Sequence, residues 1–149
     1  MRFLTDKIRK LDIGWNERPL SEADVYGLCA RFDVVICEEP LLTDGFYFRM
    51  MGKDFIAIDS GLPPTKKLFV LLHELGHLLF HVPRSGPTVK FHAVGRYTRT
   101  EREADVFALC GLVPRTWIER RHIVELIEEE GLSAEMLIER LTILDRYGI

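Results

Sequence analysis

The stretch "FVLLHELGHLLFH", residues 69–81, decides how the fold and the function of this chain are read. Leucine, phenylalanine and valine fill most of it, which is typical of a helix buried in a protein core. Three polar side chains interrupt the apolar run: His73, Glu74 and His77. Because imidazole and carboxylate groups are costly to bury without partners, their presence here needs a specific explanation.

The spacing of the two histidines suits a shared metal ion. His73 and His77 are four residues apart, so on a helix they lie one turn apart and differ by about 40° around its axis. Both imidazoles can then reach one zinc ion at Zn–N distances of about 2.0–2.1 Å. Glu74 is turned about 100° from His73. From there it can act as a general base on a water at the ion, which is the H-E-x-x-H arrangement.

The third ligand is expected from another element, because catalytic zinc sites usually have three protein ligands and one open position. The segment "TEREAD", residues 100–105, supplies three acids on the next predicted helix. Glu101 and Asp105 share a helix face. We therefore assign Glu101 as the ligand and Asp105 as the acceptor of a hydrogen bond from the far nitrogen of a ligating histidine. Glu103 is the alternative ligand, and the acid that is not used would lie in solvent or pair with a neighbouring arginine.

Three further side chains are candidates for a part in the site. His81 lies one more turn along the helix, where it is either a fourth ligand or substrate contact or, as we favour, a partner of the helix C-terminus. His92 and Tyr97 precede the helix that carries Glu101. Each is a candidate donor to the oxyanion that forms when a peptide bond is hydrolysed.

The rest of the chain predicts an α+β domain that spans residues 1–149. Ser21 and an acidic first turn predict a helix over 21–32. Short β-type runs at 34–39, 45–50 and 54–59 predict a small antiparallel sheet, with "MGKD" at 51–54 as a hairpin turn. Residues 55–59 are also a candidate for pairing with an extended substrate. Pro64 begins the helix that carries His73, 82–97 form a loop, and further helices follow at 99–113, 116–130 and 133–147.

Composition and charge exclude several classes of protein. The 149 residues carry a net charge of -3, and no long run of like charges suggests general affinity for nucleic acid. No apolar stretch reaches the roughly 18 residues of a membrane span, and the N-terminus lacks the pattern of a secretory signal. Cys29, Cys37 and Cys110 form no CxxC pair and fit a reducing compartment. These features predict a cytoplasmic protein, with the bacterial cytosol as the default location.

The run "HELGHLLFH", followed after a loop by "EREADVFALCGLVP", resembles the ImmA/IrrE family of metallopeptidases, in the gluzincin group of HExxH zinc peptidases. The similarity covers about residues 45–115. It implies a zincin-like fold, with a small sheet packed on the HExxH helix and further helices over 116–147. It also implies His73 and His77 as zinc ligands, Glu74 as the catalytic glutamate, and Glu101 as the downstream ligand in the pattern E-x-E-A-[DN]-x-F-A.

The resemblance implies a regulatory role as well, and a bacterial origin or an origin in a phage or other mobile element. Members of the family commonly cleave or otherwise control a transcriptional repressor, and many carry or neighbour a helix-turn-helix domain. The chain leaves no room for such a domain before residue 21 or after residue 147. We therefore expect a bare catalytic domain whose partner, a DNA-binding repressor encoded nearby, is a separate protein.

Two functions follow from these observations. The favoured one is a zinc-dependent endopeptidase that cleaves a regulatory protein such as a transcriptional repressor. The alternative is a zinc-containing regulatory protein that binds a repressor or DNA without cleaving anything, although the modest negative charge disfavours direct DNA binding. A purely structural zinc site is disfavoured, because such sites usually use four ligands rich in cysteine.

Overall fold

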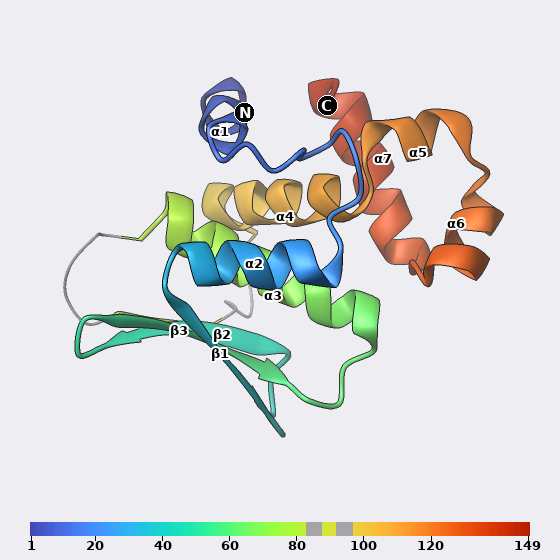
Figure 1. Ribbon diagram of the computed structural model, residues 1–149. Coiled ribbons are helices and arrows are strands. Elements are labelled where there is room, and N and C mark those ends of the chain that lie inside the picture. The colour runs from blue at the N-terminus through green and yellow to red at the C-terminus, as the bar shows by residue number, and fades with distance from the viewer. Residues whose placement is uncertain (83–87, 92–96) are drawn as a thin grey trace.

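A four-stranded sheet and the helices stacked above it make up the described part of the molecule (Figure 1). The structure is a computed structural model, and it describes residues 1–82 and 97–149 together with the backbone of residues 88–91. The elements in chain order are α1 (Arg2–Arg9), α2 (Glu22–Arg31), β1 (Val34–Glu39), β2 (Gly45–Met50), β3 (Lys53–Asp59), α3 (Pro64–Phe80), β4 (Thr88–Phe91), α4 (Arg99–Leu112), α5 (Arg115–Arg120), α6 (Ile123–Glu130) and α7 (Ala134–Tyr147). The predicted α+β class is confirmed.

The sheet is mixed, whereas the sequence predicted an antiparallel one. Strands β2 and β3 form the predicted antiparallel hairpin, in which Met50 faces Lys53. Met51 and Gly52 make its two-residue turn with positive φ angles of 53° and 73°, as tight hairpin turns require. Strand β1, however, pairs with β3 in parallel. Residues 40–44 lead from β1 to β2 without pairing them, and β3 returns into the gap between the two, so it runs in the direction of β1.

The strand order corrects two further predictions. The order is β1-β3-β2-β4, so β3 has a neighbour on each side. Residues 55–59 therefore have no open edge for a substrate strand, and the prediction that they pair with one is wrong. The segment 82–97, predicted to be a loop, contains β4, which pairs with β2 in antiparallel fashion. Its four residues are too few to show a clear period in the sequence.

Helix α3 lies inside the molecule, between the sheet and α4 (Figure 1). It begins at Pro64, as predicted, because proline is favourable at the first helical position, where no backbone N–H is needed. Every residue from Val70 to His77 is buried, so the helix has no solvent-facing stripe over these two turns. The polar trio of the HExxH motif therefore lies in the core of the molecule.

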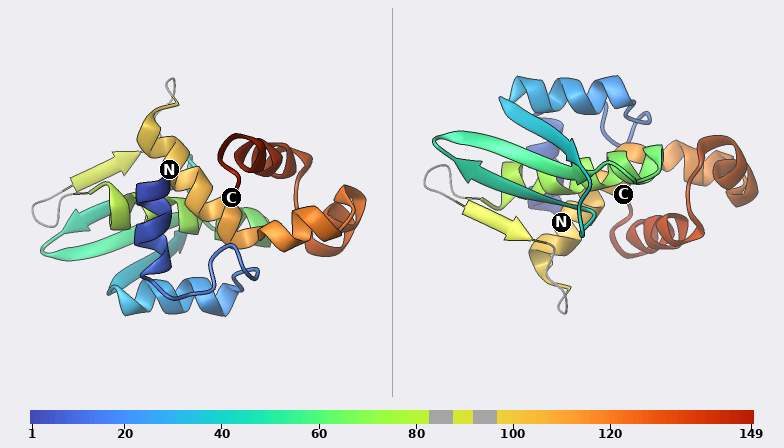
Figure 2. Two further views of the ribbon diagram at one scale, coloured as in Figure 1. Left: turned by 90° about the horizontal axis from the view of Figure 1, so that it is seen from above. Right: turned by 90° about the horizontal axis from the view of Figure 1, so that it is seen from below.

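The helical elements follow the predictions with two exceptions. Ser21 caps α2 through a capping box with Asp24, and α7 begins after the capping residue Ser133. Helix α1 was not predicted. The predicted helix over 116–130 is two helices, because Arg121 is in an extended conformation between α5 and α6. Neither glycine nor proline marks this break in the sequence. Figure 2 shows α5, α6 and α7 beside the helix layer, away from the sheet.

A buried arginine joins the C-terminal helix to the rest of the fold. Arg140 of α7 is 0% exposed, and its guanidinium donates to the Val113 carbonyl at 2.7 Å, the Ile149 carbonyl at 2.9 Å and Asn16 Oδ1 at 3.0 Å. Three separate segments thus meet on one side chain. None of the helices in the described ranges has the length and hydropathy of a membrane span.

Candidate metal centre

The site is formed where α3 and α4 pack most closely. Gly76 of α3 faces α4, and a Cβ atom added to it would lie 3.1 Å from Phe107 Cδ1 and 3.4 Å from the Ala104 Cα. The missing side chain lets the two helices approach, and it brings the histidine face of α3 to the first turn of α4. Thr98 caps α4 there by accepting a hydrogen bond from the Glu101 backbone N–H.

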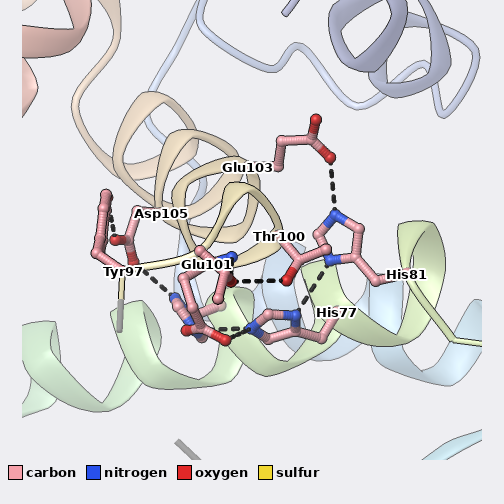
Figure 3. Close-up of polar contacts among 9 residues, drawn as sticks. His77, His81, Tyr97, Thr100, Glu101, Glu103 and Asp105 are labelled. Carbon is pink, nitrogen blue, oxygen red and sulfur yellow. Dashed lines mark hydrogen bonds and ion pairs between the residues drawn. The ribbon is translucent and has the colours of Figure 1, made fainter. Parts of the chain in front are cut away.

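The histidines of α3 and the first acid of α4 converge on one point (Figure 3). The two Nε2 atoms of His73 and His77 are 3.1 Å apart. Glu101 Oε2 is 3.2 Å from His73 Nε2, and its Oε1 is 3.1 Å from His77 Nε2. Ligand atoms on a tetrahedral zinc ion are about 3.3 Å apart, so these separations fit a common ion. The structure thus brings the three predicted ligands together into a group that can hold a metal.

The charges around this group also favour a cation. Two imidazole nitrogens at 3.1 Å repel each other through their lone pairs unless a proton or a metal ion lies between them. Burial lowers the pKa of His73, but the hydrogen bonds to Asp105 and Glu101 and the negative charges of Asp105 and Glu74 together outweigh burial and raise this pKa to about 9. In the absence of a metal, the surrounding carboxylates therefore keep the imidazole of His73 protonated. A bound metal ion would supply the same positive charge.

Asp105 fixes the orientation of His73. The Nδ1–H of His73 donates to Asp105 Oδ1 at 2.7 Å, while the Tyr97 hydroxyl donates to Asp105 Oδ2 at 2.6 Å. As a neutral ring with its proton on Nδ1, His73 would direct the lone pair of Nε2 to a metal ion between His77 and Glu101. Asp105 thus lies in the position that the sequence suggested, one turn after Glu101 and behind a histidine of the candidate ligand group.

Of the two candidate oxyanion donors, only Tyr97 is in the described part of the chain, and His92 lies outside it. The Tyr97 hydroxyl lies between Asp105 and Glu139 Oε1, which is 3.2 Å away. Burial and the two carboxylates raise the pKa of Tyr97. Its hydroxyl therefore stays protonated and donates a hydrogen bond to Asp105. A role at an oxyanion stays a prediction, and it would require the hydroxyl to turn away from Asp105.

Glu74 is buried next to the candidate ligand His73. It directly follows His73 on α3 and is 1% exposed. Leu71, Leu72 and Leu75 of the same helix are each 0% exposed, so this part of α3 is shielded from bulk water. The geometry is consistent with the general-base role predicted from the H-E-x-x-H spacing, which stays a prediction.

Glu103, the alternative third ligand, lies apart from the metal-binding group. Its Oε2 is 2.9 Å from His81 Nε2, and its Oε1 accepts from Arg99 Nε at 2.8 Å. His81 in turn places Nδ1 3.1 Å from Nδ1 of His77, on the side of that ring opposite Nε2 (Figure 3). His81 is therefore not a fourth ligand. Sequence reasoning missed this contact, although the four-residue spacing from His77 was a signal for it.

Comparison with known proteins agrees with the geometry. The family model described as Peptidase_M78, IrrE N-terminal-like domain, matches residues 29–142. "Uncharacterized immunity region protein 2" of Bacillus phage phi105 is 34% identical to this chain over 74 residues, which are 50% of this chain and 46% of that protein. The chain thus spans about half the length of this relative. No solved structure matches. The family model covers well over half of the chain, and the chain belongs to the Peptidase_M78, or ImmA/IrrE, family.

Proposed function

Starting from membership of this peptidase family, we propose that the chain is a zinc-dependent endopeptidase of the cytoplasm that cleaves a regulatory protein, such as a transcriptional repressor. The observation that carries the proposal is the convergence of His73, His77 and Glu101 within 4.8 Å of one another, next to a buried Glu74. Two imidazole nitrogens and one carboxylate form a ligand set that zinc prefers, and they leave the fourth position of a tetrahedral site for water or substrate.

A zinc ion held by these ligands would lower the pKa of a bound water toward about 7 and polarise the carbonyl of the peptide bond. The protein's own groups complete the reaction. Glu74 takes the proton of the attacking water and later gives it to the leaving amine. Asp105 keeps His73 in the correct tautomer throughout, because it accepts the Nδ1 proton. The buried leucines beside Glu74 exclude water that would weaken these interactions.

A regulatory substrate is supported by two observations. The relative from phage phi105 is named after an immunity region, and the modest net charge of -3 disfavours direct DNA binding by the chain itself, which favours a separate DNA-binding partner. A separate DNA-binding protein encoded beside this chain is therefore the substrate that we propose to test first.

The test is co-expression of the chain with each neighbouring repressor, followed by mass spectrometry of the repressor fragments. The parent protein should contain one zinc ion per chain and produce a defined cut. Glu74→Gln should retain zinc, because Glu74 is not a ligand, and should lose cleavage by a factor of at least about 100. Glu101→Ala should lose zinc and cleavage together.

Two outcomes would contradict the proposal. Cleavage by Glu74→Gln at the parent rate would remove Glu74 as the general base. Release of the repressor from its DNA without a cut, by the parent and Glu74→Gln alike, would show a binding protein instead of a peptidase.

A further inference from the structure

We propose that His81 and Glu103 form a hydrogen-bond relay that holds His77 in its metal-binding tautomer and orientation. His81 and Glu103 are positioning residues, because they act through His77 and do not touch the metal. The inference rests on the metal site of the proposed function, and it assigns a role to two side chains that the peptidase mechanism above leaves unused.

The relay is continuous from the metal-binding group to the surface. His77 Nδ1 is 3.1 Å from His81 Nδ1, His81 Nε2 is 2.9 Å from Glu103 Oε2, and Glu103 Oε1 accepts from Arg99 Nε at 2.8 Å. Figure 3 shows the first two contacts as an unbroken line from His77 through His81 to Glu103. Each distance is that of a hydrogen bond.

Metal binding fixes the position of every proton in this line. To offer a lone pair from Nε2, the neutral ring of His77 must carry its proton on Nδ1. That proton can be donated to His81 only if Nδ1 of His81 is an acceptor, so the proton of His81 must be on Nε2. From Nε2 it is donated to Glu103, which as a carboxylate accepts only. The three groups therefore fit together in a single arrangement.

Burial restricts the side chains of the relay to this arrangement of hydrogen bonds. The side chains of His81 and Glu103 are only 5% and 13% exposed, so water does not easily replace a missing partner. Arg99, whose side chain is 77% exposed, is the last residue of the relay at the surface. Its Nε–H donates to Glu103 and so holds this carboxylate in position. The backbone N–H of His81 makes the capping bond to the His77 carbonyl at the end of α3.

With the relay, both candidate ligand histidines have a hydrogen-bond partner at Nδ1 that leads to an acid of α4. His73 has Asp105 behind its Nδ1 at 2.7 Å. His77 has His81 behind its Nδ1 at 3.1 Å, and His81 in turn contacts Glu103 at 2.9 Å. Each of the two ligating histidines thus has an acid from α4 that orients it, one directly and one through a second imidazole.

Zinc affinity tests the relay without any peptidase assay. His81→Phe keeps an aromatic ring at this position and removes both hydrogen bonds, and it should weaken zinc binding by about 10–100-fold, measured by competition with a chromogenic chelator. Glu103→Ala, which keeps His81, should weaken zinc binding less. His122→Phe is the matched control: His122 is exposed and makes no side-chain cap on α6, so its affinity should equal that of the parent.

The tautomers give a second readout, which a merely structural role would not produce. Long-range ¹H–¹⁵N spectra of the zinc-loaded parent should show the proton of His77 on Nδ1 and that of His81 on Nε2. A proton on Nδ1 of His81, or parent-like zinc affinity in both His81→Phe and Glu103→Ala, would overturn the relay. If the parent itself bound no zinc, that result would contradict the metal site of the proposed function, and the relay, which rests on that site, would be contradicted as well.

Discussion

Gly76 of α3 lies so close to Ala104 of α4 that a methyl group on Gly76 would be 3.4 Å from the Ala104 Cα. The ring of Phe107 would be closer still, at 3.1 Å. Backbone atoms cannot turn aside as a flexible side chain can, and Phe107 is 0% exposed. The glycine inside the HExxH motif therefore sets the distance between the two helices that carry the metal ligands.

Gly76→Ala should accordingly destabilise the protein and weaken zinc binding. Alanine gains about 1 kcal/mol over glycine in a helix, but overpacking a core typically costs about 1–3 kcal/mol. The control is Gly27→Ala on α2, where a Cβ atom meets nothing within 4 Å. That variant should gain about 0.5–1 kcal/mol. Urea denaturation compares the two variants, and equal stabilisation of both would show that the interface has room at Gly76.

The metal-free protein should lose stability as the pH rises from about 6.5 to about 9. His73 has a pKa of about 9 in the folded chain against 6.5 as its ordinary value. Because the folded state binds the proton more tightly, the stabilisation is fully present below pH 6.5 and disappears as the pH rises through about 9. Thermal unfolding in a chelator measures this loss. The dependence should be absent in His73→Gln, and a melting temperature of the metal-free parent that rises over this range would contradict the prediction.

Tyr97→Phe should separate the observed contact of Tyr97 from its predicted role at the oxyanion. The variant loses one hydrogen bond to Asp105, so we expect zinc affinity and repressor cleavage each to fall by less than about tenfold. Loss of an oxyanion donor would instead lower the cleavage rate by about 100-fold or more and leave zinc affinity unchanged. Chelator competition and initial cleavage rates together decide between the two.

Arg140→Ala should be among the most destabilising single changes outside the metal site. It would remove the Arg140 donor from the Val113 carbonyl and one of the two donors to Asn16 Oδ1, which also accepts from the Arg115 backbone N–H, and it would create a cavity at a side chain that is 0% exposed. The expected loss is about 3 kcal/mol or more in the free energy of unfolding. Arg120→Ala, at an exposed position of α5, should change it by less than about 0.5 kcal/mol. Equal denaturation midpoints for these two variants would contradict the prediction.

Features of the site that depend on helical spacing were predictable from the sequence. His73 and His77 lie on one face because they are four residues apart, and Glu101 and Asp105 share a face of α4 for the same reason. The preference for Glu101 over Glu103 followed from this pairing, and the structure places Glu101 with the histidines. Apolar periodicity and capping residues were likewise enough for the α+β class.

Features that depend on which elements become neighbours were not predictable. The parallel pairing of β1 with β3 joins strands that are separated in the chain by β2, and nothing local in either strand specifies the partner. The contact between His81 and Glu103 joins residues 22 positions apart, and it exists only because α3 and α4 pack closely at Gly76. The break at Arg121 has no glycine or proline to signal it.

The ligands of the candidate site also make a cross-link. His73 and Glu101 are 28 positions apart, so an ion that both residues bind closes a loop of that length, as a disulfide would. Closing a loop of this size restricts the unfolded chain by about 3.5 kcal/mol in the entropy model for disulfides. Cys29, Cys37 and Cys110 are all free, so the covalent chain has no bridge of its own. The metal would be a bridge that a chelator can remove.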